Sequence, residues 1–178
     1  MSTTAKKSLT KYPDIGGYPE RWPSGSIFEN EGKRLYDLVR KYKPNKIVEV
    51  GTRWGCSTQW LAAACRDNGK GHVDTYDIEN LHQPWPEDLS PYITFIQHSI
   101  FDEPVSECDM LFEDGAHTTG FTSGVLLQIK AKVIVIHDYM HFGCVETVHE
   151  EALETLGEPT EVFFEDPSDC GLAIYVYR

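Results

Sequence analysis

Short β-branched segments that alternate with helical segments constrain the fold of this chain more than any other feature. The segments rich in Val, Ile and aromatic residues are 46–50, 72–77, 93–96, 109–112 and 132–136. Apolar residues at helical spacing predict helices over 27–42, 57–65, 123–130 and 145–156. This alternation predicts an α/β fold with a mostly parallel, doubly wound, Rossmann-like sheet and right-handed crossovers. A Pro- and Gly-containing turn separates segments 160–164 and 172–177, which predicts a C-terminal antiparallel hairpin.

The domain organisation follows from length and from the positions of proline. The chain has 178 residues, which favours one domain with a full core. Residues 1–26 are rich in Pro, Gly and aromatic residues, so we expect a surface segment that caps a pocket. Residues 27–178 then form the single domain. Two connections, 78–91 with three prolines and the short 98–108, leave room only for short helices.

Charge and composition exclude several functional classes. The net charge of −12 argues against binding to nucleic-acid phosphates. No apolar run approaches the ~20 residues of a membrane-spanning helix, and no secretory signal precedes the first helix, so we expect a cytoplasmic protein. The five cysteines are widely spaced without a CxxC motif, which predicts reduced thiols rather than disulfides or a zinc site.

A glycine turn follows the first predicted strand, at the edge where parallel sheets bind ligands. Its sequence is Glu49-Val50-Gly51-Thr52-Arg53-Trp54-Gly55-Cys56-Ser57-Thr58. The glycines allow close approach of a ligand, and the helix that follows offers free N–H groups. Arg53 replaces the second glycine of G-x-G-x-x-G, so the turn favours a ligand without pyrophosphate. Taken alone, the turn is as compatible with a structural role as with a cofactor site.

Polar residues follow the other predicted strands as well. Asp77 comes roughly 20 residues after the glycine turn, a distance at which a carboxylate accepts hydrogen bonds from ribose hydroxyls. A helix-capping role is the alternative for Asp77. Asp114 and His117 follow the fourth strand, and the pair His137-Asp138 follows the fifth.

Together these features resemble the class I S-adenosylmethionine-dependent methyltransferases. The motif E-x-G-x-x-x-G corresponds to Glu49, Gly51 and Gly55, and the ribose-binding acid corresponds to Asp77. The D-G-x-H motif at 114–117 and the H-D-Y motif at 137–139 are similar to the small-molecule O-methyltransferases of the cephalosporin-hydroxylase and macrolide-sugar methyltransferase group. The resemblance extends from about Leu38 to the C-terminus.

The resemblance implies a cofactor site and a catalytic pair. The implied S-adenosylmethionine contacts are Glu49, Gly51, Thr52, Gly55, Ser57, Asp77, His98 and Ser99. The implied catalytic residues are Asp114 and His117, with His117 as the general base. Methyl transfer from a sulfonium needs alignment of oxygen, methyl and sulfur and removal of a hydroxyl proton, for which a histidine near a carboxylate is suited. His117 as a cap at the start of a helix is the structural alternative.

The resemblance also implies a divalent metal, Mg²⁺ or Mn²⁺, held by Asp114, His137 and Asp138. The family has an acidic pair where this chain has His137-Asp138. Imidazole suits Mn²⁺, Fe²⁺ or Zn²⁺ better than Mg²⁺, and the absence of any metal stays open.

The leading hypothesis is S-adenosylmethionine-dependent O-methylation of a small hydroxylated acceptor, such as a sugar or a catechol-like group. The D/N-P-P-Y/F signature of amino-methylating enzymes is missing after the fourth strand, which argues against nucleic acid as the substrate. The alternative is a non-catalytic nucleoside-binding α/β module that acts as a sensor or partner subunit, and the lack of a substrate domain favours it. An iron oxygenase built on His117, His137 and Asp138 is a third, disfavoured reading.

The acceptor pocket has several candidate residues. Tyr139, His141 and Phe142 follow the fifth strand, and Trp22, Trp54 and Trp85 offer stacking surfaces. We expect the N-terminal segment, the 78–91 loop or a second subunit of a homodimer to close the pocket.

Overall fold

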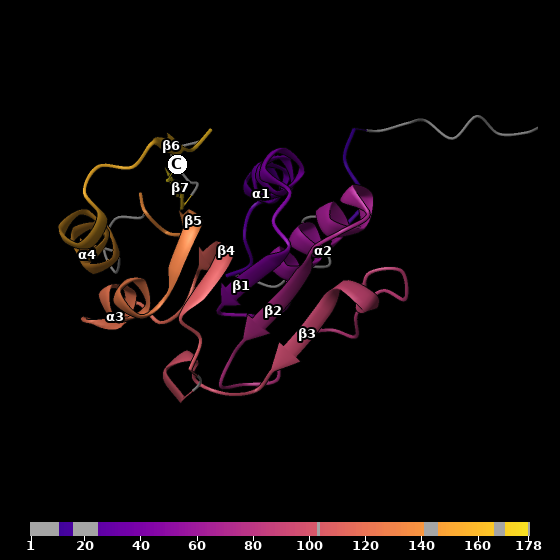
Figure 1. Cartoon of the computed structure of the whole chain (residues 1–178), viewed down its shortest axis with the longest axis horizontal. Helices are drawn as coiled ribbons and strands as arrows, with labels where there is room; N and C mark the ends of the chain where they lie inside the picture. Colours follow the sequence, from indigo (N-terminus) through magenta and orange to yellow (C-terminus); the bar gives the residue numbers. More distant parts are fainter. Residues whose placement is uncertain (1–10, 16–24, 103, 141–145, 166–169, 178) are drawn as a thin grey trace, which may run out of the picture.

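A computed structural model gives the fold and describes residues 11–15, 25–102, 104–140, 146–165 and 170–177 (Figure 1). Within them, seven strands form one sheet of order β3-β2-β1-β4-β5-β7-β6. The strands are β1 (Lys46–Val50), β2 (His72–Tyr76), β3 (Ile93–Ile96), β4 (Glu107–Glu113), β5 (Lys130–Ile136), β6 (Glu161–Phe163) and β7 (Leu172–Val176). Strands β1 to β5 pair in parallel, whereas β7 is antiparallel to β5 and β6. The predicted fold class is confirmed.

Helices cover both faces of the sheet (Figure 1). Helices α1 (Glu29–Tyr42) and α2 (Cys56–Asn68) pack together on one face, and α3 (Phe121–Gln128) and α4 (Glu146–Leu156) pack together on the other. Alternate residues of each strand supply the two cores, since successive side chains point to opposite faces. In β1, for example, Ile47 packs with α1 and α2, whereas Val48 belongs to the α3 and α4 side.

Local sequence explains where the first two helices begin and end. At the start of α1, the Glu31 carboxylate accepts a hydrogen bond from the backbone N–H of Phe28. Lys43 at the end of α1 adopts a left-handed conformation, and Pro44 prevents continuation. Helix α2 begins after Gly55 and ends at Gly69, both left-handed, as is common for glycine at helix termini.

The predicted connections are confirmed as short. The 78–91 region contributes only the start of the 3₁₀ helix η1 (Ser90–Tyr92), and the described residues of the crossover to β4 contain only η2 (Ile100–Asp102). The helix predicted at 123–130 lies instead at Phe121–Gln128, and β5 starts at Lys130 rather than at 132. Parallel pairing of Lys130 with Glu107 on β4 extends both strands beyond their β-branched cores.

The predicted N-terminal cap, residues 1–26, lies largely outside the described residues. Of its described part, Ile15 is buried in the core and Tyr12 packs edge-on against Tyr36 of α1. No helix in the part of the chain that the structure describes combines the length and apolar character needed to cross a membrane.

Candidate active site

A cavity of about 530 Å³ lies at the carboxyl ends of β1, β2, β4 and β5. Chain order reverses between β1 and β4, so the loops after these strands diverge and leave a crevice. Its size falls in the range typical of small-molecule sites, roughly 300–1,000 Å³. The predicted site residues that line it are Gly51, Thr52, Ser57, Asp77, His98, Ser99, Asp114, His117, His137 and Asp138. The sheet therefore gathers residues that are far apart in the sequence.

The loop after β1 is held tightly against its neighbours. Gly51 is left-handed, and a Cβ there would lie 1.9 Å from the carbonyl oxygen of Asp114, so only glycine fits. The backbone N–H of Arg53 donates to Oδ2 of Asp77 at 2.7 Å. Oδ1 of Asp77 accepts from the N–H of Glu79 at 3.0 Å. These bonds fix the Asp77 carboxylate at the cavity wall.

Two predicted cofactor contacts, Glu49 and Gly55, are absent from the cavity wall. Glu49 is fully buried beneath the loop, where Ser57 Oγ and Thr58 Oγ1 each donate to its carboxylate at 2.6 Å. A Cβ on Gly55 would clash with the ring of Trp85, which is not among the residues that line the cavity. Glu49 therefore holds the start of α2 from beneath the loop, Gly55 leaves room for the Trp85 ring, and neither residue lines the cavity.

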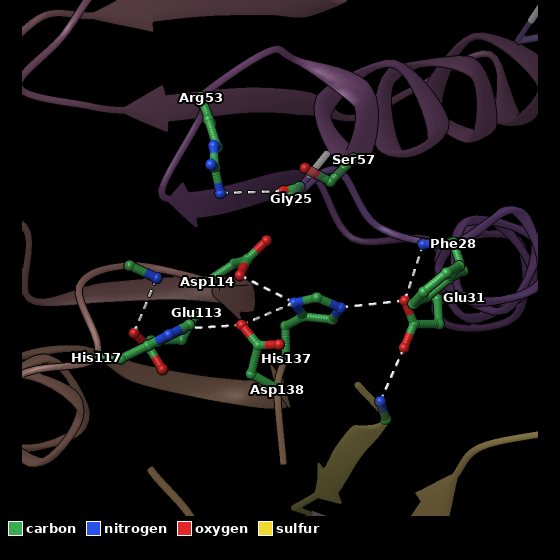
Figure 2. A network of polar contacts seen from close by, with 12 residues as sticks. Gly25, Phe28, Glu31, Arg53, Ser57, Glu113, Asp114, His117, His137 and Asp138 are labelled. Atoms are coloured by element: carbon green, nitrogen blue, oxygen red, sulfur yellow. Dashed lines mark hydrogen bonds and ion pairs between the residues drawn. The ribbon is translucent and has the colours of Figure 1, made fainter. Parts of the chain in front are cut away.

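Two histidines and three carboxylates form a polar cluster beside the cavity, and all but one of them line it (Figure 2). His117 Nε2 lies 2.9 Å from Asp138 Oδ2. His137 Nδ1 lies 3.0 Å from Asp114 Oδ1 and 3.4 Å from Asp138 Oδ2, while its Nε2 lies 3.1 Å from Oε2 of Glu31. The His117 side chain is 30% exposed and His137 only 6%, so His117 is the histidine that a ligand can reach.

Glu31 is the member of this cluster that the sequence analysis missed. Its side chain is fully buried and also accepts a hydrogen bond from the Gly171 N–H at 2.8 Å. The signal was present in α1, where Glu31 shares the buried face with Leu35 and Leu38. A carboxylate in an otherwise apolar helical stripe indicates a buried partner.

The surroundings set the charge of each group. Burial alone would lower the pKa of His137, but Asp114, Asp138 and Glu31 outweigh it and raise that pKa well above 6.5. Burial would raise the pKa of Asp138, yet hydrogen bonds from His117 and His137 hold it far below the usual range. The hydrogen bond to Asp138 raises the pKa of His117. The cluster therefore holds a buried imidazolium and a charged carboxylate.

The predicted metal set, Asp114, His137 and Asp138, does not fit as it stands. The ring nitrogens of His137 lie within hydrogen-bond distance of the Asp114 and Glu31 carboxylates, and these charges favour the protonated ring, which offers no lone pair to a metal. Among the described residues, the structure brings ligand atoms within 4.8 Å of one another in two groups, Asp114, His117 and Asp138, and His137, Asp138 and Cys170. In the first group the Nε2 of His117 already pairs with Asp138, so a cation would have to displace it.

The remaining predicted pocket residues are distributed as follows. Trp54 lines the cavity, whereas Trp85 stacks on His82 with ring centres 4.1 Å apart. Tyr139 is buried against His149 and is absent from the cavity lining. Trp22, His141 and Phe142 lie outside the described residues.

Solved structures with this fold cover most of the chain. A Bacillus cereus O-methyltransferase in complex with S-adenosylhomocysteine (SAH) is 17% identical, with a TM-score of 0.60 over 88% of this chain and 84% of that one. The O-methyltransferase TomG of Streptomyces achromogenes, in complex with S-adenosylmethionine (SAM), is 18% identical, with a TM-score of 0.59 over 88% and 83%. The SAH-bound methyltransferase PaMTH1 of Podospora anserina is 16% identical, with a TM-score of 0.61 over 89% and 83%. At 16–18% sequence identity, this structural similarity establishes the fold alone.

Sequence similarity indicates the protein family of this chain. Comparison with curated protein sequences found no match. A family model described as a methyltransferase domain matches residues 48–150, from β1 to the first part of α4. This segment contains the glycine turn, Asp77 and all of the cluster except Glu31, and it confirms the resemblance noted in the sequence. Because the match covers more than half of the chain, the chain belongs to the methyltransferase-domain family.

Proposed function

We propose that the protein transfers a methyl group from SAM to a hydroxyl group of a small molecule. One observation carries the proposal: a single cavity is lined by both the Asp77 carboxylate and a ligand-accessible His117–Asp138 pair. The fold neighbours named above include O-methyltransferases bound to SAM or SAH, which supports the same reading.

The loop after β1 and the end of β2 are suited to the cofactor. The close packing of Gly51 on Asp114 leaves bare backbone at the crevice, where a ligand can approach without meeting a side chain. Asp77 is oriented by two N–H donors and retains lone pairs for ribose hydroxyls. His98 and Ser99, farther along the same wall, would border the adenine.

The His117–Asp138 pair would accept the proton of the acceptor. SAM, held by the loop after β1 and by Asp77, would supply an electrophilic methyl group for transfer to the acceptor oxygen, and SAH would be the leaving product. Neutral His117 takes the hydroxyl proton, and the Asp138 carboxylate stabilises the resulting imidazolium. His137, which is only 6% exposed and has carboxylates at both ring nitrogens, would hold Asp114 in place, and the fully buried Glu31 would hold His137.

The first test is titration of SAM and SAH into purified, metal-stripped protein by calorimetry. We expect micromolar binding by the wild type and a loss of about ten-fold or more for Asp77→Ala, because charge-assisted hydrogen bonds are worth roughly 1.5–3 kcal/mol. Asp102→Asn, which changes an exposed aspartate outside the cavity, is the matched control. Absence of binding by the wild type would refute the proposal.

Catalysis is tested separately from binding. We expect His117→Asn to retain SAH affinity but to lose about 10²–10⁴-fold in SAH formation with hydroxylated acceptors, the usual contribution of a general base. Since the raised pKa of His117 must be exceeded for it to act as a base, wild-type turnover should rise with pH through that pKa. SAM binding without turnover on any acceptor would favour the non-catalytic module instead.

We also propose a cytoplasmic location and a homodimer, as the sequence analysis expects. The four cysteines of the described residues are free thiols, in keeping with a reducing compartment. Sedimentation of the purified protein tests the dimer.

A further inference from the structure

Carboxylates outnumber arginine and lysine side chains in the described lining of the cavity. Its described wall carries four carboxylates, those of Asp77, Glu79, Asp114 and Asp138. Arg53 is the sole arginine or lysine among the described lining residues. None of the ion pairs between described residues includes Arg53. A permanent cation in an acidic cavity without a carboxylate partner is free to bind an anionic ligand group.

The backbone directs this side chain across the crevice. Arg53 is a non-glycine residue with φ of 44°, in the left-handed region that costs about 1–3 kcal/mol. Its N–H is bound by Asp77, while its Nη1 donates to the Gly25 carbonyl at 3.3 Å. Figure 2 shows the guanidinium reaching Gly25, with Ser57 of α2 beside it. The guanidinium therefore lies between the loop after β1 and the segment that precedes α1.

Two neighbouring features favour an anion at the same place. Ser26 also lines the cavity, and its buried Oγ has no hydrogen-bond partner within the described residues. The N-terminus of α2, which starts at Cys56 without a side-chain cap, adds the positive end of a helix dipole. Together they offer a fixed charge, an unpaired hydroxyl and a favourable field.

We propose that Arg53, assisted by Ser26, binds the α-carboxylate of the methionine part of SAM; this inference rests on the proposed function. SAM carries a sulfonium, an ammonium and one carboxylate. Asp77 and Glu79, which belong to no ion pair between described residues, favour its cationic groups and repel the carboxylate, so Arg53 supplies the matching charge. A guanidinium binds a carboxylate in a bidentate manner, which a lysine does not reproduce.

The test compares SAM with decarboxylated SAM, which lacks only the carboxylate, by calorimetry on wild type, Arg53→Gln and Arg53→Lys. We expect wild type to bind SAM about 10- to 100-fold more tightly than the decarboxylated analogue, from charge-assisted hydrogen bonds. In Arg53→Gln this ratio should fall close to one through loss of SAM affinity, with a partial fall in Arg53→Lys and in Ser26→Ala. The backbone bond to Asp77 persists in both Arg53 variants.

Lys70→Gln is the matched control, since it removes one exposed cation after α2, at the opposite edge of the sheet from the cavity. Lys70→Gln should leave the ratio of the affinities for SAM and decarboxylated SAM unchanged, which would exclude an effect of net charge alone. A ratio in Arg53→Gln equal to that of the wild type would overturn the role of Arg53 and leave the proposed function intact. Failure of wild type to bind either compound would refute both.

Discussion

Neighbouring groups, rather than residue type, set the charge of the buried ionisable residues. His137 stands among three carboxylates, so its raised pKa keeps it protonated. Glu49 is also buried but accepts hydrogen bonds from the hydroxyls of Ser57 and Thr58, and burial, with a smaller contribution from the charge of Asp114, raises its pKa to about 7. The same desolvation thus leaves one group charged and another close to neutral, according to the partner that packing provides.

The raised pKa of Glu49 predicts how stability depends on pH. Its folded-state pKa of about 7 exceeds the ordinary 4.5, so the native state binds this proton more tightly than the unfolded state. The stabilisation that this proton gives the folded state is complete below about pH 4.5 and is lost as pH rises through 7. Glu49→Gln abolishes this dependence.

We therefore expect the free energy of unfolding of Glu49→Gln, relative to that of the wild type, to increase between pH 5 and 8. The gain should be on the order of 2–3 kcal/mol, measured by urea unfolding. Glu107→Gln changes an exposed glutamate on β4, and its free energy of unfolding should depend on pH in the same way as that of the wild type. Parallel curves for Glu49→Gln as well would contradict the prediction.

At the scale of elements, Glu31 connects three segments that are far apart in the sequence. Its carboxylate binds the start of α1, the His137 ring after β5 and the Gly171 N–H before β7. The segments before α1, after β5 and before β7 all contribute to the cavity wall. The position of α1 is thereby coupled to the geometry of the cluster.

We expect Glu31→Gln to destabilise the protein by about 2 kcal/mol in urea unfolding at pH 7, because a buried charged hydrogen bond is replaced by a poorer one. Glu29→Gln is the matched control in the same first turn, where an exposed pair with Lys33 contributes about 0.3–0.5 kcal/mol. Equal effects of the two substitutions would show that burial of Glu31 is not what matters.

At the scale of the whole molecule, the reversal of strand order concentrates acidic residues at one edge of the sheet. The histidines of the cluster compensate part of this charge internally, since His117 and His137 pair with Asp138 and Asp114. A divalent cation at the same carboxylates would have to displace those contacts.

Removal of divalent cations should therefore leave SAH affinity and turnover unchanged. The measurement is calorimetry and SAH formation with and without EDTA, followed by addition of Mg²⁺ or Mn²⁺. Activity that disappears with EDTA and returns with Mn²⁺ would show instead that a metal replaces the histidine contacts.

The sequence by itself determined the order and type of the elements and the loops that carry the site. Strand and helix periodicity are local, and the ends of parallel strands must meet at one edge. For that reason the amino-acid order alone assigns Gly51, Asp77, Asp114 and His117 to one cavity. Motif position did not distinguish residues that face a ligand from residues that support the loop, as Glu49 shows.

Only the tertiary structure decided which groups touch and what charge they carry. Glu31 and His137 are 106 positions apart, and no local pattern encodes their contact. That contact depends on how α1 packs across the sheet, and it converts an expected metal ligand into a buried imidazolium. Periodicity specifies which face of an element is buried. The protonation state of a buried side chain depends instead on its distance from charged groups on other elements, and tertiary packing sets that distance.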